Sequence, residues 1–152
     1  MVAVAPSSDE QKCATLSFPS TLYLQPILEL LVAPVPTRWH SEVRLGLQEA
    51  LVNAAKHGNQ LDPAKSVLVR YSTRNEQFWW IISDQGDGFS PPGSCASQLN
   101  HHAEITDKCV GDCGRGLYLM RQIFDQVHWT SEGRELHLCK RIRRWARNPL
   151  LP

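Results

Sequence analysis

The sequence of 152 residues lacks a long uninterrupted apolar run. Its most apolar stretch, residues 22–35, is broken by two prolines, a Gln and a Glu, so it falls short of the roughly 20 residues that span a membrane. The basic start and apolar core of an export signal are also missing from residues 1–10. We therefore expect a soluble, cytoplasmic protein without a membrane partner.

An excess of either charge is lacking as well, because 16 Lys and Arg balance 15 Asp and Glu to a net charge of +1. Such a balance produces no global field for nucleic acid or anionic lipid, so we expect no direct nucleic-acid partner. The five cysteines are an odd number, which favours reduced thiols over a disulfide framework.

The patterns that are present fit one domain with a single core. Residues 38–57 are amphipathic at helical spacing, and Gly58-Asn59 supplies the end of that helix. Residues 90–112 are polar and aperiodic, which indicates a functional loop or lid. The other expected elements are a strand over 13–18, a helix from Ser20 or Thr21 to Leu31, strands over 66–72 and 77–83 joined by residues 73–76, a helix after Gly116, and strands over 127–130 and 135–140. Trp79 and Trp80 should point to opposite faces of their strand.

Three polar side chains share one stripe of the long helix, because Glu49, Asn53 and His57 follow one another at four-residue steps. A carboxylate can deprotonate a hydroxyl group, and a neighbouring amide oxygen can bind Mg2+. The same stripe also fits a solvated helix edge that ends in a polar cap.

Two glycine-rich segments follow. Asp84, Gly86 and Gly88 end a buried strand, where a carboxylate could accept a hydrogen bond from an adenine amino group. Gly114 and Gly116 lead into a helix whose free N–H groups suit phosphate oxygens, and Arg115 adds charge there. Taken separately, the first segment also fits a plain turn, and the second also fits a helix entry without a ligand.

Together the three segments resemble, in order and spacing, the ATPase superfamily of gyrase, heat-shock chaperone ATPases, histidine kinases and mismatch-repair ATPases. Residues 49–58 resemble the Asn box of the anti-sigma-factor serine kinases of bacterial sporulation and stress responses. Residues 84–89 resemble their adenine loop, 114–120 their second glycine box and 133–142 their terminal strand.

The resemblance implies an α+β fold, a two-layer α/β sandwich of the histidine-kinase-like ATPase type. A mixed, mainly antiparallel sheet would carry helices on one face, with ATP on the helical side under the lid. The domain would span residues 13–142, between flexible termini at 1–12 and 143–152.

Carried over by position, the resemblance makes Glu49 the general base and Asn53 the Mg2+ ligand, with ATP as the nucleotide. The ATP-binding positions that it implies are Asn53, His57, Asp84, Gly86, Gly88, Gly114, Arg115, Gly116 and Leu117. One departure is Arg134, which stands where many relatives place a Thr that helps to hold the adenine through water.

The function implied is a serine/threonine-protein kinase that phosphorylates a Ser of a small anti-sigma-factor antagonist and so switches the partners of a sigma factor. A homodimer is implied as well, through the N-terminal arm. One alternative is a nucleotide-gated module that binds an anti-sigma-type partner without kinase turnover, and another is a stand-alone ATPase. Glu49 favours the kinase, because a pure binder needs no base beside the metal ligand.

The lid suggests one more hypothesis. Its soft ligands could hold Zn2+ or form a redox-sensitive pair, although their spacing matches no standard zinc motif. These ligands are Cys95, His101, His102, Cys109 and Cys113.

Overall fold

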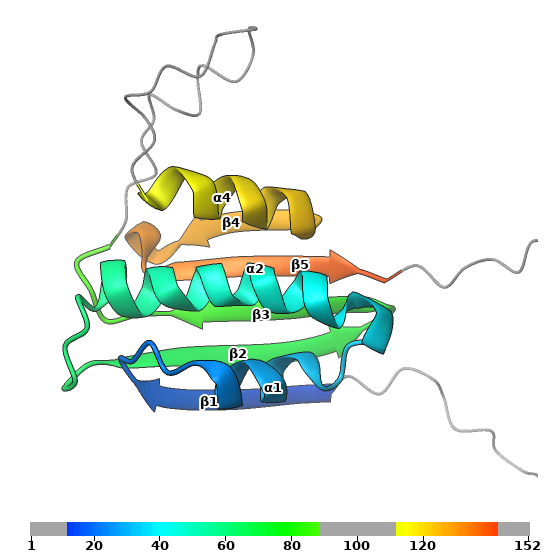
Figure 1. Cartoon of the computed structure of the whole chain (residues 1–152), viewed down its shortest axis with the longest axis horizontal. Helices are drawn as coiled ribbons and strands as arrows, with labels where there is room; N and C mark the ends of the chain where they lie inside the picture. The colour runs from blue at the N-terminus through cyan, green and yellow to red at the C-terminus, as the bar shows by residue number, and fades with distance from the viewer. Residues whose placement is uncertain (1–11, 89–111, 143–152) are drawn as a thin grey trace, which may run out of the picture.

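The computed structural model describes residues 12–88 and 112–142, which form a sheet with helices on one face (Figure 1). The strands pair in the order β1-β2-β3-β5-β4, and every pairing in the described residues is antiparallel. Their bounds are β1 Lys12–Pro19, β2 Ser66–Arg74, β3 Gln77–Ser83, β4 Gln126–Thr130 and β5 Glu135–Arg141. The helices are α1 Gln25–Val32, α2 His40–Val52 and α4 Asp112–Ile123. The predicted two-layer α+β sandwich is confirmed.

The core lies between the sheet and the helices because alternate strand residues face the helical layer. Trp80 of β3 is 0% exposed, and its ring meets Phe124 edge-on at 5.8 Å between centroids. Its neighbour Trp79 is partly exposed on the other face, as the alternation predicts. The largest fully buried apolar side chains around Trp80 include Leu47, Leu51, Ile82, Met120 and Leu138.

The first helix begins later than predicted. Helix α1 starts at Gln25 with Pro26 in its first turn, where the missing proline N–H costs no hydrogen bond. Ser20 does not cap this helix, because its hydroxyl group donates to the carbonyl oxygen of Lys65 at 3.0 Å. The proposed start at Ser20 or Thr21 is therefore wrong, and Ser20 serves a different part of the molecule.

The long helix predicted over 38–57 is divided into three pieces. A short 3-10 turn, η1 (Thr37–Trp39), precedes α2, and a π-helix, η2 (Asn53–Gly58), follows it. A π-helix has a wider turn than an α-helix, so side chains after Asn53 no longer keep the four-residue spacing of the rest. π-Helical turns are frequent at functional sites.

In the β2–β3 hairpin, β2 runs two residues longer than predicted, and β3 has the predicted bounds. Only Asn75 and Glu76 separate them, with φ of 49° and 62°. Two consecutive positive φ values are typical of the type I′ turn, which matches the twist of the flanking strands. The predicted four-residue connection over 73–76 is therefore two residues too long, both of them at its N-terminal end, and its C-terminal end is correct.

Most of the predicted termini and lid lie outside the described residues. Lys12, assigned to the flexible N-terminus, is instead the first residue of β1 and lies opposite Thr73. Asp112, assigned to the lid, begins α4. Among the helices of the described residues, none is long and apolar enough to cross a membrane.

Candidate functional site

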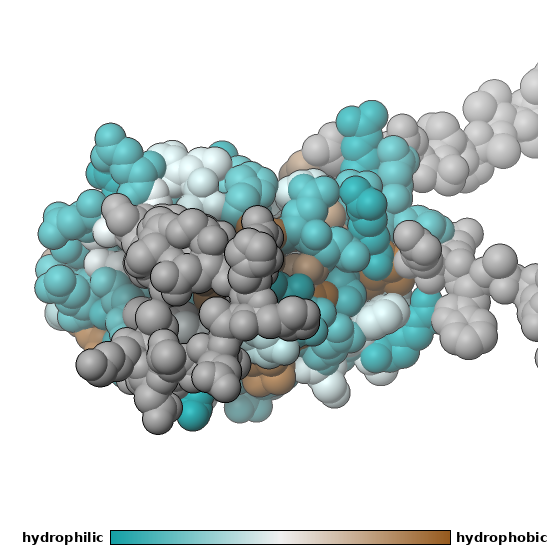
Figure 2. Space-filling model, turned by 90° about the horizontal axis from the view of Figure 1, so that it is seen from above, coloured by the Kyte–Doolittle hydropathy of each residue, from teal (hydrophilic) through white to brown (hydrophobic). Residues whose placement is uncertain are grey.

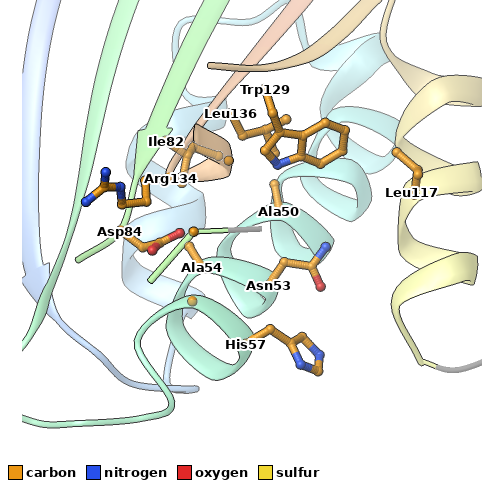
Figure 3. Close-up of a pocket in the computed structure, with 13 residues that line it drawn as sticks. Ala50, Asn53, Ala54, His57, Ile82, Asp84, Leu117, Trp129, Arg134 and Leu136 are labelled. Atoms are coloured by element: carbon orange, nitrogen blue, oxygen red, sulfur yellow. The ribbon is translucent and has the colours of Figure 1, made fainter. Parts of the chain in front are cut away.

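Four parts of the chain meet at the left edge of the molecule in Figure 1: the end of β3, η2, the turn between β4 and β5, and the start of α4. An open cleft lies between them (Figure 3). Its lining residues are Ala50, Asn53, Ala54, His57, Gly58, Ile82, Asp84, Gly88, Leu117, Trp129, Gly133, Arg134 and Leu136.

Helix α2 and the π-helix place the residues of the predicted polar stripe beside α4 and along the cleft. Asn53 and His57 both line the cleft. Glu49 lies one turn earlier and faces α4, where a Cβ atom added at Gly116 would stand 3.0 Å from its Oε2 atom. The same Cβ atom would lie 3.6 Å from Nδ2 of Asn53. The structure therefore brings Glu49, Asn53 and Gly116 together, and the glycine permits this approach.

Asp84 follows the last residue of β3, and its carboxylate points into the cleft (Figure 3). Its backbone N–H donates to the carbonyl oxygen of Arg134 at 3.0 Å, and its Oδ1 atom accepts the N–H of Gly86 at 2.9 Å. Burial raises the pKa of Asp84, while the Gly86 N–H and the charges of Arg134 and Lys65 oppose the shift. Asp84 is thus a half-buried hydrogen-bond acceptor whose backbone N–H and Oδ1 atom already have partners within the chain.

Two glycines allow the end of η2 to pack directly on the Asp84 loop. A Cβ atom at Gly58 would overlap the Asp84 carboxylate, and one at Gly86 would overlap the carbonyl oxygen of Gly58. A third glycine, Gly88, has a φ of +93° and faces the carbonyl oxygen of Glu132. Gly86 itself does not line the cleft, so its part in the site is to permit this packing.

The remaining wall is mainly apolar, and the motifs in the sequence did not reveal it. It consists of Ala50, Ala54, Ile82, Trp129 and Leu136. Alternation could have identified part of it, because Ile82 lies two residues before Asp84 on the same face of β3. An apolar wall beside a single carboxylate suits a flat heteroaromatic ring that carries an amino group.

Arg134 contributes its stem to the cleft, but its guanidinium group points away from Asn53 and Trp129 (Figure 3). The group donates to Oε2 of Glu132 at 3.0 Å and to the carbonyl oxygen of Ser131 at 3.3 Å. It therefore occupies the position of the family's Thr without directing a donor into the cleft.

Helix α4 starts four residues before the predicted entry at Gly116. Gly114 and Gly116 are helical residues within it, and Leu117 lines the cleft. The N–H groups without a helical partner belong to the first turn, Asp112–Arg115, rather than to Gly116 and Leu117. Arg115 is exposed beside them.

The proposed zinc or redox cluster falls outside the described residues, since Cys95, His101, His102 and Cys109 and the side chain of Cys113 are not described. Within the described part, no group of three or more His, Cys, Asp or Glu residues could hold a metal ion. Cys13 and Cys139 are free thiols, and burial raises the pKa of Cys139 to about 11.

Comparison with known proteins shows the family of the chain. The model of the histidine kinase-like ATPase domain family matches residues 28–140, and the chain belongs to this family. It is 29% identical over 86 residues to the serine-protein kinase RsbW of Bacillus licheniformis, covering 57% of this chain and 54% of that protein. The serine-protein kinase RsbW of Bacillus subtilis (strain 168) is 26% identical over 86 residues, with the same coverage.

The chain thus matches about half the length of these kinases. A multifunctional CCA protein of Vibrio vulnificus (strain YJ016) is 27% identical over 128 residues, which cover 84% of this chain and 25% of that protein.

Proposed function

We propose that residues 13–142 form one domain that acts in the cytoplasm as an ATP-dependent serine/threonine-protein kinase of the anti-sigma-factor type. The observation that carries the proposal is the arrangement of the cleft. Asp84 stands at one end, and Asn53, with Glu49 behind it, stands at the other beside the start of α4. The similarity to two RsbW serine-protein kinases favours the same activity.

The end of the cleft at Asp84, here called the base end, suits adenine because it offers a hydrogen-bond acceptor beside an apolar wall. The carboxylate of Asp84 accepts from the amino group, and the apolar wall formed by residues such as Ile82 and Trp129 covers the ring. Gly88, at φ +93°, leaves backbone rather than a side chain beside the ring. These residues supply a hydrogen-bond acceptor and an apolar wall for the adenine part of ATP.

The other end of the cleft, at Asn53 and the start of α4, is here called the phosphate end. It suits a magnesium-bound polyphosphate. The amide oxygen of Asn53 is a hard ligand of the kind Mg2+ prefers, and the first-turn N–H groups of α4 with Arg115 face anionic groups favourably. His57, exposed at the rim of the cleft, adds a further donor. Bound Mg-ATP supplies the γ-phosphoryl group and the metal charge that neutralises it.

Glu49 is the proposed general base. Its carboxylate lies beside Gly116 and Asn53, where it would accept the proton of an incoming Ser hydroxyl group. The Ser belongs, in this proposal, to a small anti-sigma-factor antagonist, so that phosphorylation frees or recaptures a sigma factor. The chain orients the reactants and holds the proton, which is most of what phosphoryl transfer requires of a protein.

Glu49→Gln tests the kinase directly. The variant keeps the shape of the side chain and removes the base, so phosphate transfer to a candidate antagonist should fall by about 10²–10⁴-fold. Nucleotide and antagonist should still bind. A radiolabelled transfer assay beside nucleotide titrations measures both, with Glu29→Gln on the exposed face of α1 as the control. Wild-type transfer in Glu49→Gln would leave the nucleotide-gated binding module as the better interpretation.

Asn53→Ala tests metal-dependent nucleotide binding separately from the catalytic role of Glu49, one turn away. Loss of the amide oxygen removes a metal contact, so the gain in ATP affinity that Mg2+ provides should shrink in this variant but not in Glu49→Gln. Titrations with and without Mg2+ measure this gain. An unchanged magnesium effect in Asn53→Ala would remove Asn53 as the metal ligand.

We also propose a homodimer through β1. This strand lies at one edge of the sheet, and most of its side chains are exposed. An unpaired edge strand is a template for association. Figure 2, seen from above, shows mainly hydrophilic residues among the coloured atoms, with small separate hydrophobic areas. Light scattering should give the mass of a dimer, and a monomeric mass at high micromolar concentration would exclude it.

A further inference from the structure

Asn59 is the most completely buried polar residue in the described part of the chain. It follows η2 directly, and its side chain is 0% exposed. It does not line the cleft, and the sequence marks it only as the end of a helix. A buried amide group is costly unless its donors and acceptor are paired, so its partners identify what it holds.

The side chain of Asn59 joins three separate segments. Its Oδ1 atom accepts the backbone N–H of Gln85 at 2.7 Å. Its Nδ2 atom donates to Oγ of Ser20 at 2.7 Å and to the carbonyl oxygen of Ser66 at 3.0 Å. The amide group thus connects the loop before α1, the start of β2 and the loop that follows β3.

One of these partners, Gln85, directly follows Asp84 in the sequence. A second bond holds the same residue through its side chain, because Oε1 of Gln85 accepts the N–H of Ser66 at 2.7 Å. Asp84 is held in turn by the carbonyl oxygen of Arg134. The peptide unit between Asp84 and Gln85 is therefore anchored on the side away from the cleft.

The anchoring also sets the distance between η2 and the Asp84 loop. Gly58 and Gly86 already touch, with no room for a methyl group on either. Asn59, next to Gly58, fastens Gln85, next to Gly86, at this separation. Since Asn53 belongs to η2 and Asp84 to the loop, one buried amide group fixes the two ends of the cleft relative to each other.

We propose that Asn59 is a positioning residue that places the Asp84 carboxylate for recognition of the purine amino group. The proposal rests on ATP binding in this cleft. Recognition of a polar group needs donor and acceptor in place to within about 0.5 Å, so release of Gln85 would reduce discrimination more than overall binding. GTP is the informative competitor, because guanine carries an oxygen where adenine carries the amino group.

Ser20→Ala provides a matched control. It removes the hydroxyl partner of Asn59 on the side remote from Asp84 and leaves the bond between Oδ1 and Gln85 intact. Both Ser20→Ala and Asn59→Ala disturb one buried network and should lower the melting temperature. Only Asn59→Ala leaves the Gln85 N–H without its acceptor.

The test compares ATP and GTP affinity by calorimetry in wild type, Asn59→Ala and Ser20→Ala. We expect the preference for ATP to fall about tenfold in Asn59→Ala, equal to about 1.4 kcal/mol, and to stay at the wild-type value in Ser20→Ala. A wild-type preference in Asn59→Ala, or an equal loss in both variants, overturns the positioning role. A wild-type protein without preference for ATP overturns the proposed nucleotide site instead, and this result is seen before any variant is made.

Two further measurements cover a variant that does not fold. Asn59→Asp keeps the acceptor for Gln85 and loses the two donors, so it should retain the preference for ATP despite lower stability. In the unaltered protein, amide hydrogen exchange at Gln85 should be slow, because its N–H is bonded to a buried side chain. Exchange at the rate of an unstructured amide, or loss of the preference in folded Asn59→Asp, contradicts the proposal.

Discussion

The two ends of the cleft are built differently. At the base end, the N–H of Gln85 donates to Oδ1 of Asn59, the N–H of Asp84 donates to the carbonyl oxygen of Arg134, and Oδ1 of Asp84 accepts the N–H of Gly86. At the phosphate end, the side chains of Glu49 and Asn53 have no hydrogen-bond partner among the described residues. Under the proposed function, the base end is held in place by the chain itself, and the phosphate end would become ordered when the nucleotide binds. Substitutions should accordingly affect stability at one end and activity at the other.

Gly86→Ala should have the largest effect on stability. The added methyl group meets the carbonyl oxygen of Gly58, and backbone cannot move aside as the end of a side chain can. Overpacking of this kind costs about 1–3 kcal/mol of unfolding free energy. Denaturant unfolding measures it, and a variant as stable as wild type would mean that η2 and the loop are not fitted together as described.

At the phosphate end, Gly116→Ala should lower phosphate transfer without lowering the unfolding free energy. Ala favours a helix over Gly by about 1 kcal/mol, and the atom nearest to the added methyl group is Oε2 at the end of the Glu49 side chain, at 3.0 Å, followed by Nδ2 of Asn53 at 3.6 Å. We expect unfolding free energy to be unchanged or raised by at most that amount, while phosphate transfer falls about 10–100-fold because Glu49 is displaced. A strong loss of stability would remove the contrast between the two ends.

The smallest expected effect is a pH dependence at Asp84. Its pKa is raised above the unfolded value, so its contribution to stability is present below the unfolded pKa and is lost as pH rises through the folded pKa. ATP binding needs the ionised carboxylate of Asp84, so the affinity for ATP should rise as the pH rises. The difference in melting temperature between wild type and Asp84→Asn, followed from about pH 4 to pH 7, isolates this group. Asp84→Asn should become the more stable protein as pH rises, and a constant difference would contradict this assignment.

Sequence patterns were sufficient to predict the order of the helices and strands. They also identified charged and polar residues of the site, such as Asp84, and the glycines of its loops, such as Gly88. Alternation in the first strand and β-branched and aromatic runs in the hairpins located the five strands, and both Asn53 and His57 of the predicted polar stripe line the cleft. These features are local, because each follows from neighbours within one turn or one strand. The family match over residues 28–140 confirms the resemblance that the motifs carry.

The features that the patterns did not predict depend on distant parts of the chain. Asn59 has the appearance of a helix stop, yet its bonds reach residues 39 and 26 positions away. The π-helical turn at Asn53 and the early start of α4 at Asp112 likewise reflect packing rather than propensity. The apolar wall, including Trp129, is visible only once β4 is placed beside β5.

The central claim is that the cleft binds Mg-ATP with Asp84 as the reader of the adenine base. Calorimetry of Mg-ATP with wild type, Asp84→Asn and Asp87→Asn tests it most directly, because Asp87 is an exposed carboxylate of the same loop outside the cleft. Asp84→Asn should weaken binding by about 1–3 kcal/mol, since an amide group mispairs with the amino edge of adenine, and Asp87→Asn should bind as wild type does. Equal affinity of wild type and Asp84→Asn for Mg-ATP would contradict the account.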